Sequence, residues 1–439
     1  EADRGPAELC FFNTRVEHLS DEERRFTLTD EDFRLINPNT RTCPVFRTQQ
    51  DAELTKKIYR RVPVLVNEAD DENPWGITFK QGLFNMSSDS DLFHTREGLE
   101  EQGAELKGNR FVLGDEVYLP LYESKMIWQF DHRFGTYSGV ESRSSTHLPK
   151  LYERDHQSPD CLTESWYWAH RQPAQEQLDR WAVAFRRNTN VTNERTGAFT
   201  ILEAVAAGDS VFFMIPDSTA QLGAALTAAC NSIVFDFFLR QKLGGTNMNF
   251  FYIEQLPVLP PKSLSSHDLA TIVSRTLELI YTAWDIKPFA DDVWADALTP
   301  GPSPAGRGER EARGEGLREA IRAQWEANKD ATGGHAWELP DWIDAYPEIE
   351  TDPDKGIPLP PFKWDEARRA RLRAELDAYY AQLYGLTEEE LRYILDPKDV
   401  YGADFPGETF RVLKEKEIKQ FGEYRTKRLV LEAWERLKH

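Results

Sequence analysis

Several features that mark other classes of protein are missing from this sequence. It has only four cysteines, and they are too far apart to form a CxxC pair: Cys10, Cys43, Cys161 and Cys230. This spacing argues against a zinc site and predicts a reducing compartment, the cytoplasm. No apolar run approaches the roughly 18 residues of a membrane-spanning helix, and no signal peptide opens the chain. We therefore expect neither a metal site nor a membrane partner.

Positive charge is also scarce. The 439 residues include 53 Lys and Arg against 74 Asp and Glu, which gives a net charge of -21. An acidic chain is not expected to bind nucleic acid indiscriminately, because such binding uses a basic surface. The stretch from Arg110 to Lys262 is nearly neutral, however. A nucleic-acid site would have to lie in this stretch, with its Arg and Lys gathered on one face.

A convergent set of catalytic side chains is missing as well. Asp131 and His132 are adjacent, but no nucleophile or second base accompanies them, so we expect a structural hydrogen bond at this histidine. Apolar and aromatic side chains, in contrast, are plentiful: the hydrophobic fraction is 40%, with 25 Phe. This composition is typical of folded domains, and the length allows two or three of them.

The most informative stretch ends at Pro261. Apolar residues at helical spacing predict one amphipathic helix across Leu222, Leu226, Ala229, Ile233 and Phe237. Gly244 and Gly245 are expected to end it, because glycine tolerates the left-handed conformation after a helix. A polar turn follows, then a predicted short strand from Phe250 to Ile253, which the prolines at 257, 260 and 261 close.

The polar turn and the residues before it are candidates for ligand binding. Thr246, Asn247 and Asn249 can donate and accept hydrogen bonds. Asp236 precedes Arg240 by four residues, which predicts an ion pair between them. Lys242 has no such partner in the sequence, and we therefore assign it to the ligand together with the turn.

A second polar segment, residues 186–196, contains three Arg, three Asn and three Thr. An arginine can bond both acceptors of guanine, and an asparagine can bond both groups of adenine. We assign five of these residues to base recognition: Arg186, Arg187, Asn190, Asn193 and Arg195. The alternative interpretation is a solvated hairpin loop.

An aromatic segment, Val117 to Phe134, precedes both. Its aromatic side chains are expected to pack, including Trp128 and Phe134, while Lys125, Gln129 and Arg133 are expected to face the ligand. Near the C-terminus, a predicted helix from Thr409 carries Lys414, Lys416 and Lys419. Two interpretations of this helix stay open, a solvated face and contact with a nucleic-acid backbone.

The sequence resembles a known family in several strings. They are INPNTRTCPVFRTQQDAELTKKIYRRVPVL from Ile36, PLYESKMIWQFDHRF from Pro120, GGTN from Gly244, and GETFRVLKEKE followed by GEYRT near the C-terminus. Together they are similar to the C-terminal target-recognition region of large adenine-specific DNA methyltransferases of the type IIG restriction-modification and phage-defence group. The resemblance extends from about Cys10 to Trp434. It implies that double-stranded DNA is the ligand of the residues assigned above.

The catalytic motifs of that family are absent from the sequence. Neither a [DN]PP[YF] loop nor a Gly-rich turn after a strand is present; Leu359-Pro360-Pro361-Phe362 lacks the leading Asp or Asn. We expect no catalytic residue and no cofactor in this chain. S-adenosylmethionine and catalysis are expected in a missing methylase domain, which would be a partner in the same parent chain or a separate subunit.

The resemblance implies an α+β fold, a mixed target-recognition domain flanked by helical segments. We place a connector at 1–62, the recognition domain at 63–262, a helical segment at 263–298, a flexible linker at 299–316 and a C-terminal helical domain at 317–439. The predicted function is sequence-specific recognition of double-stranded DNA for adenine methylation in bacterial restriction or phage defence. Two alternatives are an acidic protein–protein interaction module without DNA binding and, ranked last, an independent hydrolase.

Overall fold

The computed structural model describes residues 5–143, 148–296 and 307–438, without the side chains of 307–313. Helices and antiparallel sheets both contribute to the chain, so the predicted α+β class is confirmed. The strands are β1 (Ala7–Cys10), β2 (Arg25–Leu28), β3 (Ile77–Gln81), β4 (Phe93–Thr95), β5 (Glu105–Lys107), β6 (Arg110–Leu113), β7 (Glu116–Tyr122), β8 (Tyr167–His170), β9 (Ala182–Arg186), β10 (Phe199–Leu202), β11 (Ala206–Ala207) and β12 (Val211–Pro216).

The helices cluster in the second half of the chain. They are α1 (Asp30–Ile36), α2 (Gln49–Arg61), α3 (Arg96–Glu101), α4 (Glu153–His156), α5 (Arg171–Gln175), α6 (Ala220–Asn231), α7 (Ile233–Lys242), α8 (Phe250–Glu254), α9 (Ser266–Ile280), α10 (Lys287–Asp296), α11 (Arg307–Thr332), α12 (Glu366–Leu383), α13 (Glu388–Leu395), α14 (Pro397–Tyr401), α15 (Arg411–Phe421) and α16 (Arg425–Arg436).

The centre of the molecule is an antiparallel sheet in the order β10-β9-β12-β3. Side chains alternate between its two faces, as the pleat of a strand requires. Phe185 and Phe212 pack on the face toward the helices, and Ala184 and Phe213 pack on the opposite face. Both faces are therefore buried, which explains why β9, β10 and β12 are apolar apart from Thr200 and the terminal Arg186.

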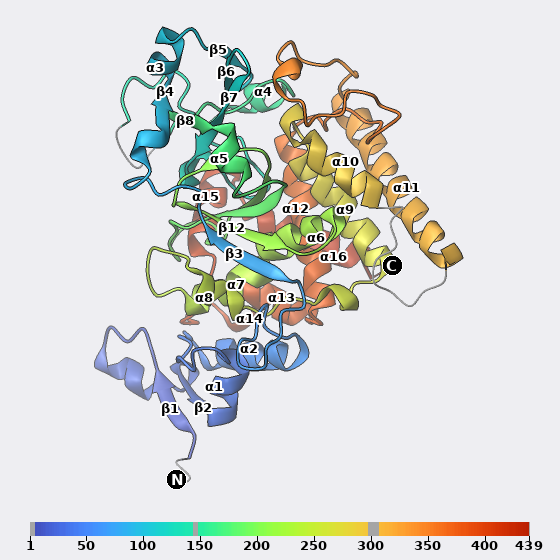
Figure 1. Ribbon diagram of the computed structural model, residues 1–439. Helices are drawn as coiled ribbons and strands as arrows, with labels where there is room; N and C mark the ends of the chain where they lie inside the picture. Colours follow the sequence, from blue (N-terminus) through green and yellow to red (C-terminus); the bar gives the residue numbers. More distant parts are fainter. Residues whose placement is uncertain (1–4, 144–147, 297–306, 439) are drawn as a thin grey trace.

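A second sheet, in the order β4-β8-β7-β6-β5, lies at the upper left in Figure 1, with β11 pairing in parallel to β7. On the other side of the central sheet, the helices share one hydrophobic core from Phe26 to Trp434. The N-terminal segment with β1, β2 and α1 projects at the bottom of the same view. The central sheet thus lies between a small β layer and a helical layer.

The predicted long helix is two helices. α6 and α7 are bent by 60° at Ser232, whose backbone is extended and whose hydroxyl caps α7 by accepting from Phe235 N at 3.2 Å. Next to it, the Asn231 side chain bonds the backbone of Phe199 on β10, at 3.0 and 2.8 Å. The break between the two helices is therefore fixed by side-chain hydrogen bonds. The dipeptide Asn231-Ser232 indicates it in the sequence, because Asn and Ser are favoured at the start of a helix.

Two further local predictions are wrong. Phe250 to Ile253 belongs to the short helix α8, because Phe250 folds back onto Phe79 and Phe212 of the central sheet, with ring centroids 4.9 and 4.6 Å apart. α7 ends at Leu243 without a left-handed glycine.

Of the predicted linker, residues 307–316 are helical in α11, and residues 299–306 lie outside the described residues.

No single helix in the described ranges is long and apolar enough to cross a membrane. Together, α6 and α7 have the length and apolar composition of a membrane-spanning segment, but both helices are buried in the core of the fold.

Candidate nucleic-acid interface

The two polar segments singled out in the sequence lie side by side. One is the loop of residues 188–197 between β9 and β10, and the other is the turn of residues 244–249 between α7 and α8. The amide of Thr189 donates to the carbonyl of Thr246 at 2.9 Å, and the amide of Met248 donates to the carbonyl of Arg187 at 2.8 Å. Asn188 and Asn247 form a β-bridge between them. The loop and the turn therefore make one surface.

Amide and hydroxyl side chains cover this surface. Asn188, Thr192, Asn193 and Thr246 are exposed; Asn190, Asn247 and Asn249 are half-buried. Some of these side chains already form hydrogen bonds with one another or with the backbone of the surface. Asn188 Nδ2 donates to Asn247 Oδ1 at 3.3 Å, and Asn190 Oδ1 accepts from the backbone and hydroxyl of Thr192 at 2.9 and 2.8 Å. Asn190 thus shapes the loop, while Asn193, Asn247 and Thr246 present polar groups to solvent.

A buried charge network supports the loop from below. Asp236 of α7 forms an ion pair with Arg195, whose Nε lies 3.1 Å from Oδ2. It also accepts hydrogen bonds from Arg240 Nε at 3.2 Å and from the amide of Thr196 at 3.1 Å. Arg240 also donates to the loop carbonyls of Val191 and Asn193, at 2.8 and 2.9 Å. The predicted Asp236–Arg240 pair is confirmed, and its task is to hold the loop in shape.

Four of the residues assigned to DNA serve internal contacts instead, contrary to expectation. Arg195 is buried against Asp236. Gln129 is buried and donates to the carbonyl of Gly197 at 2.9 Å. Arg133 is fully buried and donates to main-chain carbonyls, among them Ser158 at 2.9 Å and Thr282 at 3.0 Å. These arginines bond groups that are distant in the sequence, which local pattern could not reveal.

Lys242 is the fourth. Its Nζ donates to the carbonyl of Ile36 at 2.7 Å, to the side chain of Asn37 and to the carbonyl of Gln255. Burial holds the pKa of Lys242 well below its usual value. The ammonium group ties α7 to the end of α1, and it is not available to a phosphate.

The remaining cations of the assigned set lie nearer the surface. Lys125 is half-buried, 3.6 Å from Glu123 and over the ring of Tyr137. Arg186 and Arg187 are half-buried at the end of β9, where successive side chains point to opposite faces. Arg186 lies over Trp128 and Arg187 over Phe212, 5.1 and 5.5 Å from the ring centroids.

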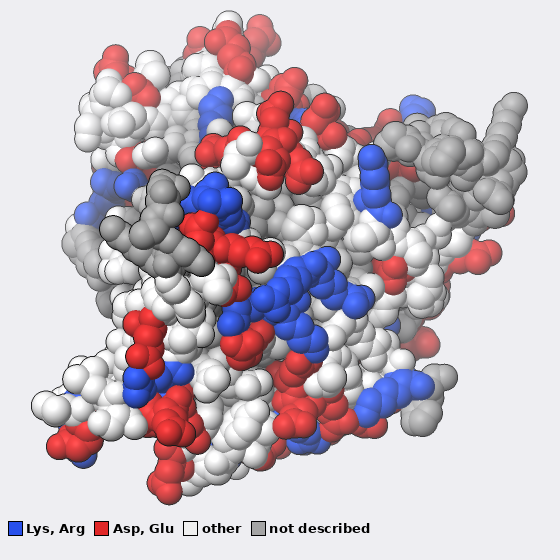
Figure 2. All heavy atoms as spheres, turned by 90° about the horizontal axis from the view of Figure 1, so that it is seen from below, with Lys and Arg blue, Asp and Glu red and all other residues white. Residues whose placement is uncertain are grey.

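The basic residues of the C-terminal helices are mostly paired with acids. Lys414 contacts Asp396 at 3.0 Å, and Arg428 contacts Glu423 at 2.8 Å. Lys416 differs, because its partner is Glu194 in the 188–197 loop. On the face drawn in Figure 2, basic side chains gather in a short cluster near the centre, between acidic side chains. Across the described part of this face, the basic surface is local.

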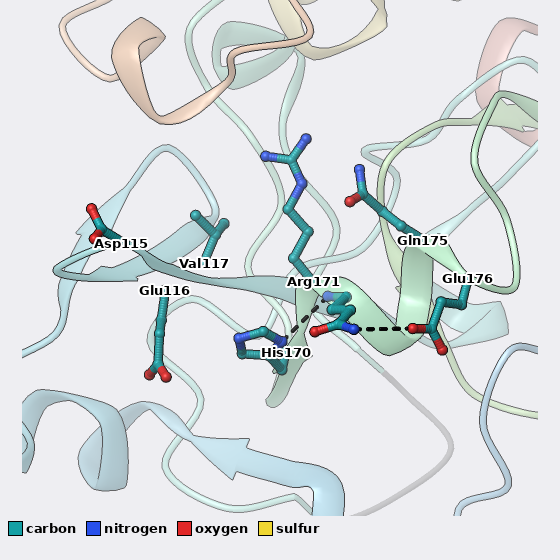
Figure 3. Close-up of a pocket in the computed structure, with 8 residues that line it drawn as sticks. Asp115, Glu116, Val117, His170, Arg171, Gln175 and Glu176 are labelled. Carbon is teal, nitrogen blue, oxygen red and sulfur yellow. Dashed lines mark hydrogen bonds between the residues drawn. The ribbon is translucent and has the colours of Figure 1, made fainter.

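One hollow was not anticipated from the sequence. It is open, with a volume of about 510 Å³, and lies beside β7, β8 and α5. Most of the residues that line it are of charged or polar type, and Figure 3 draws them: Asp115, Glu116, Val117, His170, Arg171, Gln172, Gln175 and Glu176.

The side chains of this hollow are already engaged in local contacts. His170 Nδ1 accepts from the amide of Gln172 at 3.3 Å and so caps α5, and Gln172 donates to Glu176 at 3.1 Å. Arg171 lies 3.4 Å from Glu348. No nucleophile–base pair converges among the lining residues. His132 is likewise structural, since it is buried and hydrogen-bonded to Asp285 at 3.0 Å.

Within the described ranges, no group of three or more His, Cys, Asp or Glu is arranged to hold a metal ion. Comparisons with known proteins found no matching family model, no matching curated protein and no matching solved structure.

Proposed function

We propose that this chain recognises double-stranded DNA through the joined 188–197 loop and 244–249 turn. The observation that carries the proposal is their pairing through main-chain hydrogen bonds, with exposed amides and hydroxyls from both segments on one surface. Such groups bond base edges in the major groove, where Asn matches adenine. The Asp236 network beneath them preorganises the loop, so binding does not lose the free energy that ordering a mobile loop would cost.

The net charge of -21 is compatible with this role if contact is local. Duplex DNA is repelled by acidic surface and attracted only where cations are gathered. Arg186 and Arg187 lead directly into the loop, and Lys416 lies beside it. An otherwise acidic exterior would limit binding at the wrong place, which favours specificity over general affinity.

In its wider setting, the chain would be the recognition portion of a bacterial adenine-specific DNA methyltransferase in restriction or phage defence. The resemblance in sequence supports this assignment. A methylase domain, with S-adenosylmethionine, would extrude the target adenine for reaction. The recognition surface would select the site and the backbone contacts would orient it. The setting would be cytoplasmic.

The test is binding of a short fluorescent duplex to the 439-residue chain, measured by anisotropy over a range of salt concentrations. We expect affinity to fall linearly on a log–log plot as salt rises. Asn193→Ala and Thr246→Ala should weaken binding to the preferred sequence. Gln102→Ala is the matched control, because Gln102 is an exposed amide at the end of α3 and away from both segments. Absence of salt-dependent binding would contradict the proposal.

A specific observation also favours the second candidate, a protein-interaction module. Phe12, Val16 and Leu19, between β1 and β2, are 53%, 79% and 56% exposed. Clustered apolar side chains on a projecting segment are a feature of protein interfaces. If the chain binds no duplex, and Val16→Asp abolishes association with a partner protein, this candidate replaces the first.

A further inference from the structure

Two stacked aromatic rings, each with a cation over it, lie beside the 188–197 loop. Trp128 and Phe134 are stacked, with ring centroids 5.3 Å apart and planes 23° apart. The guanidinium of Arg186 lies 5.1 Å from the ring centre of Trp128, and Lys150 Nζ lies 4.4 Å from that of Phe134. Both rings are half-buried. The stack therefore carries a positive group on each of its two rings.

Main-chain hydrogen bonds position the residues of this stack. The amide of Trp128 donates to the carbonyl of Asp131 at 2.8 Å, closing a tight turn in which Phe130 has a left-handed backbone with φ 57°. Phe130 is tied to Phe199 of β10 by a 2.8 Å main-chain bond. Lys150 is paired in a β-bridge with Gly135. Main-chain pairing thus fixes the backbone positions from which both cations extend, Arg186 on β9 and Lys150 beside Gly135.

The charge of Arg186 is uncompensated. Its Nε is buried without a hydrogen-bond partner, and no carboxylate in the described part of the chain forms an ion pair with it. Burial lowers the pKa of Arg186 to about 10, which still leaves it charged at neutral pH. A half-buried charge without a counter-ion is costly to a fold. Trp128 offsets part of that cost, since cations are attracted to indole rings.

Lys416 of α15 completes a group of three cations. Partial burial lowers the pKa of Lys150, and the nearby charges of Lys416 and Arg186 lower it further. Two acids act on Lys150 in the opposite sense: Glu194, which pairs with Lys416, and the buried Asp131. The group therefore has an excess of positive charge next to the surface of amides and hydroxyls.

We propose that Arg186, Lys150 and Lys416 form a binding site for a phosphodiester group, framed by the Trp128–Phe134 stack. A phosphate supplies the missing counter-charge, and the arginine fork matches its oxygens. The inference rests on the proposed function, in which that phosphate belongs to the DNA backbone at the edge of the base-reading surface. The site then fixes the position of the duplex, and the adjacent amides read the bases.

The test compares Arg186→Met, Lys150→Met and their combination with the unchanged 439-residue chain. Methionine keeps apolar cover over the rings and removes the charge. Each single change should make the slope of log affinity against log salt shallower by about one unit. Arg186→Lys should keep the slope. Lys355→Met is the control, because Lys355 is exposed and lies on a different segment, 3.5 Å from Asp352.

Thermal unfolding separates a binding site from a structural contact. If Arg186 serves a ligand, Arg186→Met should leave the melting temperature of the free chain unchanged or raise it. If its role is to cover Trp128, the melting temperature should fall and the salt slope should stay constant. That second pattern would overturn the inference while duplex binding, and with it the proposed function, stands.

Two further probes identify the source of the phosphate. Inorganic phosphate should raise the melting temperature of the unchanged chain above that in chloride of equal ionic strength, and should not do so for the combined variant. If phosphate stabilises the chain in this way but no duplex binds, the phosphate site is supported and the proposed DNA recognition is contradicted. If phosphate does not stabilise the chain and no duplex binds, both the phosphate site and the proposed DNA recognition are contradicted. Binding of poly-glutamate with the same loss in the variants would overturn the inference in favour of an acidic protein partner.

Discussion

The guanidinium of Arg195 lies against the carboxylate of Asp236, with Nε 3.1 Å from Oδ2, beneath the loop to which Arg195 itself belongs. Arg240 contacts the other carboxylate oxygen at 3.2 Å. One buried acid thus compensates two arginines from different segments. The position of the candidate recognition loop depends on this acid, although the acid lies on α7 and has no access to a ligand.

Asp236→Ala should therefore destabilise the protein strongly. It leaves Arg240 buried without a counter-charge and leaves Arg195 with only Asp377, 3.9 Å away. Breaking a buried ion pair costs about 3–5 kcal/mol in other proteins. Urea denaturation followed by circular dichroism measures the loss. Glu415→Ala is the control, since its pair with Arg411 is exposed and loosely held at 3.9 Å, and such pairs contribute about 1 kcal/mol or less. Equal stability of the two variants would show that the network is not needed.

Glu194→Gln should strengthen duplex binding. Glu194 pairs with Lys416 and places a negative charge among the cations beside the loop. The substitution removes that charge and releases Lys416, whereas the carbonyl of Glu194, which accepts from Arg240 at 3.1 Å, is retained. Anisotropy at low salt should show a tighter complex and a steeper salt dependence. Weaker binding would mean that the Lys416–Glu194 pair is required as it stands.

Asn247→Ala should relax base preference without changing the salt slope. Asn247 is joined to Asn188 and carries no charge, so its loss affects base contacts and not phosphate contacts. Loss of one bidentate base contact costs about 1–3 kcal/mol for the matching base. Selection from a random duplex library, with the unchanged chain in parallel, reveals the altered position. A changed slope with an unchanged preference would contradict the assignment.

Protonation of His335 is expected to lower the free energy of unfolding as the pH falls. Burial, with the nearby charges of Lys363 and Arg133, lowers its pKa from 6.5 to about 4. Between these values the unfolded chain binds a proton that the folded chain does not, so this residue's effect on stability is absent above 6.5 and becomes unfavourable as pH falls toward 4. The free energy of unfolding of His335→Gln should therefore depend less on pH in that window. Parallel pH profiles for the two proteins would contradict the prediction.

Local features were predictable from the sequence because their causes are local. The side chains of Thr29, Ser265 and Thr387 cap α1, α9 and α13, each with an acid three residues later that completes the capping box. These hydrogen bonds span three residues, so neighbours alone determine them. For the same reason Gly385, with φ 74°, ends α12, and the apolar runs after Phe199 and Val211 form β10 and β12.

The tertiary structure decided which polar side chains reach the surface. Arg133, Arg195 and Lys242 look like ligand-binding cations in the sequence, but their partners are 149, 41 and 206 residues away at Thr282, Asp236 and Ile36. A charged side chain is buried wherever the fold brings enough acceptors to it. Composition alone therefore indicated a polar, arginine-rich segment, whereas packing determined that Arg195 supports the loop from within while Asn188 and Asn193 are exposed.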